Sequence, residues 1–283
     1  MSQQWPLPVL SLFTGYGGFE LALERSGIGV TRWQAEIDAY MREIEARHWP
    51  NARRFHDVRE VSGATDGASD VRGGILCGGF PCQPVSGAGK RLAQADPRWL
   101  WPEFARIASE LAPSLIFVEN VPGLRTAGLR DVLADLASLG FDAEWHHFRA
   151  FDIGAPHLRD RFWLVATHPD RVRVHQQPGW LGRACRARQA VIEDPRASSA
   201  VGVGSVNADS LRRLEQAREL AHQRGWSKRC GWSLDPAPRV DDGPTDGLAR
   251  GGRERARKAA GNGIVIACAQ VVAEATREAV TLL

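Results

Sequence analysis

The chain has 283 residues, of which 43% are hydrophobic and 24% are charged, and its formal net charge is +3. This composition allows one large domain, or one domain with a small second one, around a substantial core. It excludes a membrane-spanning chain, because no apolar run approaches the roughly 20 residues that a bilayer needs, and the N-terminus lacks a basic region followed by an apolar one. We therefore expect a cytoplasmic protein.

The charge is unevenly distributed along the chain. Between His168 and Ala260 there are 18 Lys and Arg residues against 11 Asp and Glu residues, so this segment carries +7 and the remainder carries −4. A local basic excess of this kind is where a polyanion could be held.

The first predicted element is a short buried strand over residues 9–13, followed at once by Gly15, Gly17 and Gly18 and then by a helix. A strand, a glycine turn and a helix N-terminus let a ligand approach the backbone and present unpaired N–H groups to it. Glu36 follows about 20 residues later, where a carboxylate can accept hydrogen bonds from ribose hydroxyls. A plain tight turn and a solvated carboxylate are the alternatives.

Cys82 lies in a tight loop directly after the short apolar run of residues 73–77, with glycines and prolines on both sides. A rigid loop at the end of a strand is a good place for a nucleophilic thiol, although cysteine is often just a small buried apolar residue. The five cysteines lack the spacing of a zinc site or of a disulfide framework, so we expect reduced thiols and no metal. They are Cys77, Cys82, Cys185, Cys230 and Cys268.

An ionisable residue, Glu119, ends the apolar strand predicted over residues 115–118, which follows a helix over residues 102–111. Open α/β sheets place ligand-binding groups at the carboxyl ends of their strands, so a binding role competes with that of a surface carboxylate. A further helix over residues 131–139 is closed by Gly140, a good C-terminal cap.

Three polar residues alternate before the next apolar strand: His157, Arg159 and Arg161. Alternation along an extended segment points them to one side.

From His168 onward the rhythm of strands and helices weakens, with one clear helix near residues 209–222 and with Trp226 and Trp232 beyond it. Charge, aromatic residues and irregular loops suit a groove-reading module, and a basic solvated insertion is the alternative. After Gly263, apolar residues recur at helical spacing, so a C-terminal amphipathic helix should pack back on the core.

Three motifs occur in a defined order: Leu12-Phe13-Thr14-Gly15-Tyr16-Gly17-Gly18-Phe19, Phe80-Pro81-Cys82-Gln83-Pro84 and Glu119-Asn120-Val121. Together they resemble the ordered motifs of the cytosine-C5 DNA methyltransferases of bacterial or phage type. The resemblance covers roughly residues 8–167 and 238–279. It implies an α/β fold of the S-adenosylmethionine-dependent methyltransferase type, Rossmann-like, with a mostly parallel sheet and a small, irregular target-recognition domain.

The resemblance also implies three parts of the chain. These are a cofactor-binding and catalytic domain over residues 1–167, a target-recognition domain over residues 168–257, and a C-terminal helix over residues 258–283 that packs back on the catalytic domain.

The implied activity is methyl transfer from S-adenosylmethionine to C5 of a cytosine flipped out of double-stranded DNA, with S-adenosylhomocysteine as product. Cys82 would attack C6, Glu119 would stabilise charge at N3, and Arg161, with Arg159 beside it, would bind the base carbonyl and orient Glu119. His157 stands where the family has a glutamine.

The implied cofactor residues are Phe13, Gly15, Gly17, Gly18, Glu36, Asp57, Val58, Pro81 and Asn262. Ser11 stands where the family often has an acidic residue, which removes one possible partner of the cofactor's amino group. We expect a monomer, with a cognate restriction endonuclease as a possible companion that forms no stable complex with it.

Three other functions remain open from the sequence. The same chemistry could act on RNA, or the chain could be a catalytically silent DNA-binding relative, although Cys82, Glu119 and Arg161 are intact. A nicotinamide oxidoreductase would share the glycine turn.

Overall fold

A computed structural model describes residues 4–81, 99–153, 159–192 and 264–283. The predictions for Cys82, His157, Asn262 and the helix near residues 209–222 lie outside these residues.

The fold is built on a seven-stranded sheet of order β3-β2-β1-β4-β5-β7-β6. β7 is antiparallel to both of its neighbours, whereas the pairs from β3 to β5 are parallel, so the predicted mostly parallel sheet is confirmed. The strands are β1 (Leu7–Leu12), β2 (Gly29–Ala35), β3 (Arg53–Phe55), β4 (Ile75–Gly78), β5 (Leu115–Asn120), β6 (Asp142–Arg149) and β7 (Asp160–Thr167).

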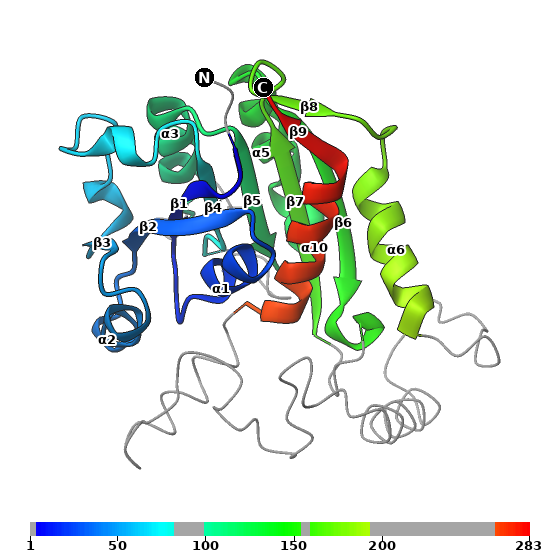
Figure 1. Cartoon of the computed structure of the whole chain (residues 1–283), viewed down its shortest axis with the longest axis horizontal. Helices are drawn as coiled ribbons and strands as arrows, with labels where there is room; N and C mark the ends of the chain where they lie inside the picture. The colour runs from blue at the N-terminus through cyan, green and yellow to red at the C-terminus, as the bar shows by residue number, and fades with distance from the viewer. Residues whose placement is uncertain (1–3, 82–98, 154–158, 193–263) are drawn as a thin grey trace, which may run out of the picture.

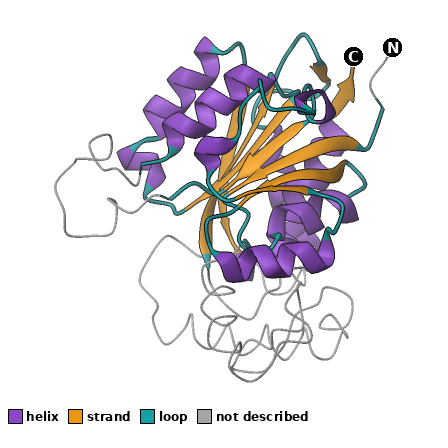
Figure 2. Ribbon diagram, turned by 90° about the vertical axis from the view of Figure 1, so that its left-hand side faces the viewer, coloured by secondary structure: helices purple, strands orange, loops and turns teal. Residues whose placement is uncertain are grey.

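Helices cover both faces of the sheet (Figure 2). Successive side chains of a strand point to opposite faces of the sheet, as β5 illustrates. Its Leu115 and Phe117 are buried on one face, and Ile116 and Val118 are buried on the other. The helices of eight or more residues are α1 (Gly18–Arg25), α2 (Ala39–His48), α3 (Trp101–Leu111), α5 (Leu129–Ser138), α6 (Trp180–Ile192) and α10 (Ile266–Ala279). The described residues also include the four-residue helix α4 (Leu124–Ala127) and the 3-10 turns η1 (Val58–Glu60), η2 (Ala68–Asp70) and η5 (Ala150–Ile153).

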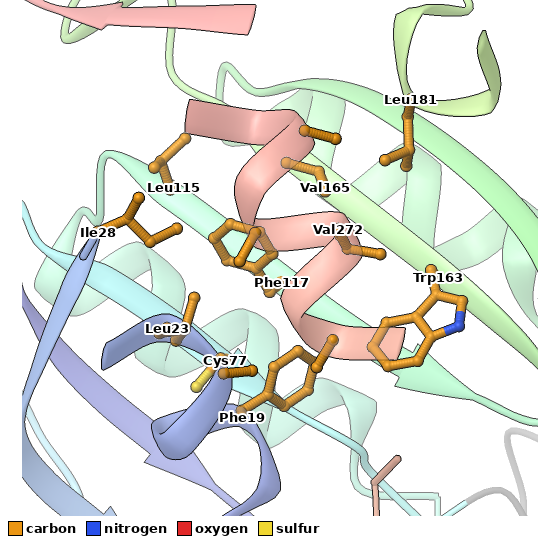
Figure 3. Close-up of a cluster of buried hydrophobic side chains, with 14 of the residues drawn as sticks. Phe19, Leu23, Ile28, Cys77, Leu115, Phe117, Trp163, Val165, Leu181 and Val272 are labelled. Carbon is orange, nitrogen blue, oxygen red and sulfur yellow. The ribbon is translucent and has the colours of Figure 1, made fainter. Parts of the chain in front are cut away.

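The predicted C-terminal amphipathic helix is α10, which lies between α1 and α6 in Figure 1. Its buried residues join those of α1, β4, β5 and β7 in one apolar cluster, where Phe19, Phe117, Trp163 and Val272 gather (Figure 3). Beyond α10 the chain forms β9 (Val280–Leu282), which pairs with β8 (Val172–Val174).

Part of the expected recognition segment packs on this core. Val172, Trp180, Leu181 and Cys185 are buried in the same cluster as α10. β8 and α6 therefore extend this apolar core beyond residue 167, and residues 193–257 lie outside the described part. Within the described residues, no helix is both long and apolar enough to cross a membrane.

Arg159 departs from the predicted extended alternation. Its φ is +23°, and β7 begins only at Asp160. The Arg159 carbonyl accepts a hydrogen bond of 3.1 Å from the N–H of Ala150, so the chain turns at η5 before it enters the strand.

Two carboxylates, Glu20 and Glu45, are fully buried beside β2. Glu20 Oε1 accepts a 3.1 Å hydrogen bond from Gln34, whereas neither side-chain oxygen of Glu45 has a hydrogen-bond partner within the described residues. Desolvation, reinforced by repulsion from Glu20 and Glu36, raises the pKa of Glu45 to about 9. Desolvation also raises the pKa of Glu20 to about 7.

We expect the free energy of unfolding to fall as the pH rises from about 4.5 to 9. In this window native Glu45 keeps a proton that the unfolded chain has lost, so the native state binds more protons and loses stability as the pH increases. The Glu45→Gln variant cannot titrate, and its loss of stability between pH 5 and pH 9 should be smaller by about 1 to 3 kcal/mol. Urea unfolding at both pH values measures this difference.

Glu43 provides the matched control, because it lies exposed on the same helix. The Glu43→Gln variant should follow the wild-type pH dependence within about 0.5 kcal/mol. If Glu45→Gln also runs parallel to the wild type, Glu45 is ionised in the native protein and the pKa argument is wrong.

Candidate active site

Those predicted functional residues that the structure describes lie mostly at one edge of the sheet. The carboxyl ends of β1, β2, β4 and β5 meet there, and the strand order changes direction between β1 and β4. Open α/β sheets bind ligands at such a switch point. The loops at this edge carry the glycines after β1, Glu36 after β2 and Pro81 after β4, and β5 ends with Glu119 and Asn120.

The glycines after β1 have different surroundings. A Cβ atom on Gly17 would lie 2.2 Å from the Trp49 ring, and one on Gly18 would lie 2.9 Å from the Cβ of Ile264. A Cβ on Gly15 would meet no atom of the described residues within 4 Å. Two glycines therefore allow close packing, and Gly15 faces open space where a ligand can approach the backbone.

Glu36 fixes the glycine loop to the end of β2. Its Oε2 accepts a 2.7 Å hydrogen bond from the N–H of Gly15, and its Oε1 accepts a 2.9 Å bond from the N–H of Asp38. Beside it, the side chain of Ile37 is 74% exposed. An exposed apolar side chain next to a carboxylate suits a nucleoside, whose base is flat and whose ribose carries hydroxyls. The sequence analysis missed Ile37.

Asp57 and Val58 lie at the start of η1, directly after β3. Asp57 caps this turn by accepting from the N–H of Arg59 and forms a 2.9 Å ion pair with the Arg59 side chain, while Val58 is buried. Asp57 therefore stabilises the local turn, and its carboxylate can still accept further hydrogen bonds.

Glu119 is 8% exposed, and its Oε1 lies 2.9 Å from Nε of Arg161. Burial raises the pKa of Glu119, and the positive charges of Arg161 and then Arg159 oppose that rise. A Cβ on Gly79 would lie 3.1 Å from Oε2, so a larger residue would crowd this carboxyl group where the loop after β4 passes it. A carboxyl group with a raised pKa can donate a hydrogen bond or a proton to an acceptor.

The antiparallel pairing of β5 with β7 brings the two arginines to Glu119. The end of β5 lies beside the start of β7, since Asn120 is paired with Phe162. Arg161 also donates a 2.7 Å hydrogen bond to the Asp160 carbonyl, which orients its guanidinium group. Desolvation, followed by repulsion from Arg161, lowers the pKa of Arg159.

Phe80 is held from two sides. Its carbonyl accepts a 3.1 Å hydrogen bond from the side-chain amide of Asn120, and its ring centroid lies 5.3 Å from the centroids of both Trp99 and Trp101. These contacts fix the backbone at Phe80, from which the described chain continues to Pro81, near the Glu119 end of β5. The role of Asn120 was not predicted, although it stands in the quoted motif with Glu119.

The comparisons with known proteins agree with this arrangement. The model of the family described as C-5 cytosine-specific DNA methylase matches residues 7–202. The Type II methyltransferase M.HgiBI of Herpetosiphon aurantiacus is 35% identical over 162 residues, which cover 55% of this chain and 36% of that protein. M.HhaI of Haemophilus parahaemolyticus is 31% identical over 169 residues, which cover 58% of this chain and 50% of that protein. The chain thus spans about a third to a half of the length of these relatives.

Two solved structures resemble nearly the whole chain. The methyltransferase EhMeth of Entamoeba histolytica aligns with a TM-score of 0.60 at 15% identity, covering 97% of this chain and 99% of that one. The Dnmt2 methyltransferase of S. pombe aligns with a TM-score of 0.58 at 16% identity, covering 96% and 99%. At these identities the likeness establishes the fold.

Proposed function

The chain belongs to the C-5 cytosine-specific DNA methylase family, and from this premise we propose that it transfers a methyl group from S-adenosylmethionine to C5 of cytosine in double-stranded DNA. The observation that carries the proposal is the ion pair of buried Glu119 with partly buried Arg161, 2.9 Å apart, beside the loop that leads to Cys82. A thiol can add to an electron-poor ring, and a protonatable carboxyl group nearby can stabilise the negative charge that this addition creates.

The proposed reaction begins with Cys82, because C5 of cytosine is a poor nucleophile within the aromatic ring. The thiolate adds to C6, and negative charge develops towards N3, where Glu119 donates a hydrogen bond or its proton. Arg161, with Arg159 beside it, binds the base carbonyl and holds Glu119. S-Adenosylmethionine supplies the electrophilic methyl group, and S-adenosylhomocysteine is left. A base then removes the C5 proton, the thiolate leaves C6, and N3 returns to Glu119 any proton that it took.

The residues at the sheet edge fit this cofactor. The open space at Gly15 lets a ligand reach the backbone, the Glu36 carboxylate can accept from ribose hydroxyls, and Ile37 offers an apolar contact to the adenine. The proposed binding set is Phe13, Gly15, Gly17, Gly18, Glu36, Asp57, Val58, Pro81 and Asn262. Ser11 is only 1% exposed, so we do not assign it a cofactor contact.

Two glycine variants should separate cofactor binding from folding. Gly15 and Gly17 both have positive φ, at +61° and +88°, so alanine strains the backbone at either position. Gly17→Ala also collides with Trp49 and should cost about 2 to 4 kcal/mol of stability. Gly15→Ala should be milder for stability, but should weaken S-adenosylhomocysteine binding at least about tenfold. Thermal unfolding and calorimetric titration measure the two effects, and the reverse pattern would contradict this cofactor site.

We propose double-stranded DNA as the partner and a monomeric enzyme with no stably bound endonuclease. The target carbon is enclosed in duplex DNA, so the cytosine must be flipped out at a cost of a few kcal/mol. The basic excess between His168 and Ala260 could offset this cost through phosphate contacts, and we assign target recognition to the part of the segment beyond α6.

Bisulfite sequencing of plasmid DNA from a methylation-free host that expresses the chain tests the proposal. We expect cytosines to be protected at one recurring sequence, and no protection with the Cys82→Ser variant. Unprotected DNA in the presence of folded wild-type protein would overturn the DNA assignment and direct the test to RNA.

A further inference from the structure

The site is assembled from segments that lie far apart in the sequence. Ile264 directly follows residues 193–263 and leads into α10, yet it packs on the glycine loop after β1. A Cβ on Gly18 would lie 2.9 Å from the Ile264 side chain and 3.0 Å from its carbonyl oxygen. The returning chain therefore touches the loop that we assign to the cofactor.

Tyr16 adds a hydrogen bond to this contact. Its hydroxyl group donates a hydrogen bond to the Ile264 carbonyl, across 248 positions of sequence. Within α10 the first accepting carbonyl is that of Val265, which bonds to the N–H of Ala269, so the Ile264 carbonyl precedes the helix ladder and takes its donor from Tyr16. Burial raises the pKa of Tyr16 to about 12, which keeps the hydroxyl group neutral and able to donate at physiological pH.

Tyr16 also lies towards the other half of the site. The charged and titratable groups that act on it are Arg159, Glu119 and Cys268. Arg159 and Glu119 belong to the group around the target base in the proposed mechanism, and Cys268 lies buried in α10. The Tyr16 hydroxyl group thus bonds the start of the returning segment at Ile264, and the charges of Arg159 and Glu119 act on it.

We propose that Tyr16 is a positioning residue, whose hydroxyl group holds the returning segment at Ile264 on the glycine loop and so keeps the cofactor-binding half of the site in place against the Glu119 half. The proposal rests on the proposed function and deepens it. Loss of the hydroxyl group should leave the reacting groups intact and let the Ile264 segment shift relative to the glycine loop. The defect should therefore be in cofactor affinity.

The same pair of helices offers a matched control at the other end of α10. Nη1 of Arg277 donates a 2.7 Å hydrogen bond to the carbonyl of Ser26, which is the C-terminal cap of α1. Helix α10 has 14 residues and is about 20 Å long, so the hydrogen bond of Arg277 is remote from the glycine loop. Both hydrogen bonds support the packing of α10, but of the two donors only Tyr16 lies in the proposed cofactor loop.

The test compares Tyr16→Phe and Arg277→Met with the wild type. Calorimetric titration with S-adenosylhomocysteine gives the affinity, steady-state kinetics give kcat and KM, and thermal unfolding gives stability. We expect Tyr16→Phe to raise Kd and the cofactor KM about fivefold to tenfold, as for one lost hydrogen bond, with kcat within about twofold. Arg277→Met should lower the unfolding temperature at least as much and leave Kd within about twofold.

Unchanged affinity in Tyr16→Phe would overturn the positioning role. Equal losses of affinity in both variants, in proportion to their losses of stability, would show that the hydrogen bond serves only packing, and this also overturns it. A wild-type protein that binds no S-adenosylhomocysteine would overturn the proposed function itself, and the wild-type titration alone reveals that outcome.

Discussion

Cys82→Ser is expected to lower methyl transfer by at least about 10⁴-fold while it leaves S-adenosylhomocysteine affinity within about twofold. A serine hydroxyl group is far less acidic than a thiol, so almost no nucleophile is present at neutral pH. Among the described residues, Phe80 precedes the loop and is held without the thiol: its carbonyl accepts a 3.1 Å hydrogen bond from Asn120, and its ring packs on Trp99 and Trp101. The substitution should therefore remove chemistry and spare the fold.

Tritium transfer from labelled cofactor into plasmid DNA measures the rate, and a gel shift with 5-fluorocytosine DNA detects the covalent complex. Cys185→Ala is the control for loss of a thiol, since Cys185 is buried in the core against α10. It should keep turnover within about twofold. Appreciable turnover or a covalent complex in Cys82→Ser would exclude Cys82 as the nucleophile.

Local signals were sufficient to predict some of the elements, among them strands β1 and β5 and helices α3, α5 and α10. A local signal also sets the start of α2, because Asp38 caps the helix by accepting a 2.8 Å hydrogen bond from the N–H of Tyr40. Gly140 ends the segment after α5 with φ of +85°, as a C-terminal glycine cap requires. Apolar runs such as that of β5 are typical of parallel strands that are buried on both faces.

Contacts between distant segments could not be predicted in this way. The hydrogen bonds from Tyr16 to Ile264 and from Asn120 to Phe80 join residues 248 and 40 positions apart. These two hydrogen bonds depend on how the strands are ordered in the sheet. The donors, Tyr16 and Asn120, belong to no periodic sequence pattern that would reveal their partners. Ile37 was visible beside Glu36 in the sequence, but single apolar side chains are common on protein surfaces, so only its 74% exposure at the sheet edge distinguishes it.

Glu119→Gln is expected to lower kcat about 10²-fold and leave DNA affinity within about threefold. The amide oxygen can still accept from Nε of Arg161, which lies 2.9 Å from Oε1 in the wild type, so the geometry of the pair should persist. The amide cannot give a proton to N3, so the loss should fall on the chemical step. Single-turnover methylation and a DNA gel shift separate the two quantities.

The protonation of Glu119 should also make the methylation rate depend on pH. Burial raises the pKa of Glu119 in opposition to Arg161 and Arg159, and the proposed mechanism uses the protonated group, so the wild-type single-turnover rate should fall as the pH rises through that pKa. Glu119→Gln should lack this alkaline decrease. Glu110→Gln is the control, because Glu110 also pairs with an arginine, at 2.8 Å from Arg106 on α3, and it should keep both the rate and the decrease. A variant at Glu119 that loses DNA affinity and keeps its rate would make the carboxyl group a structural one.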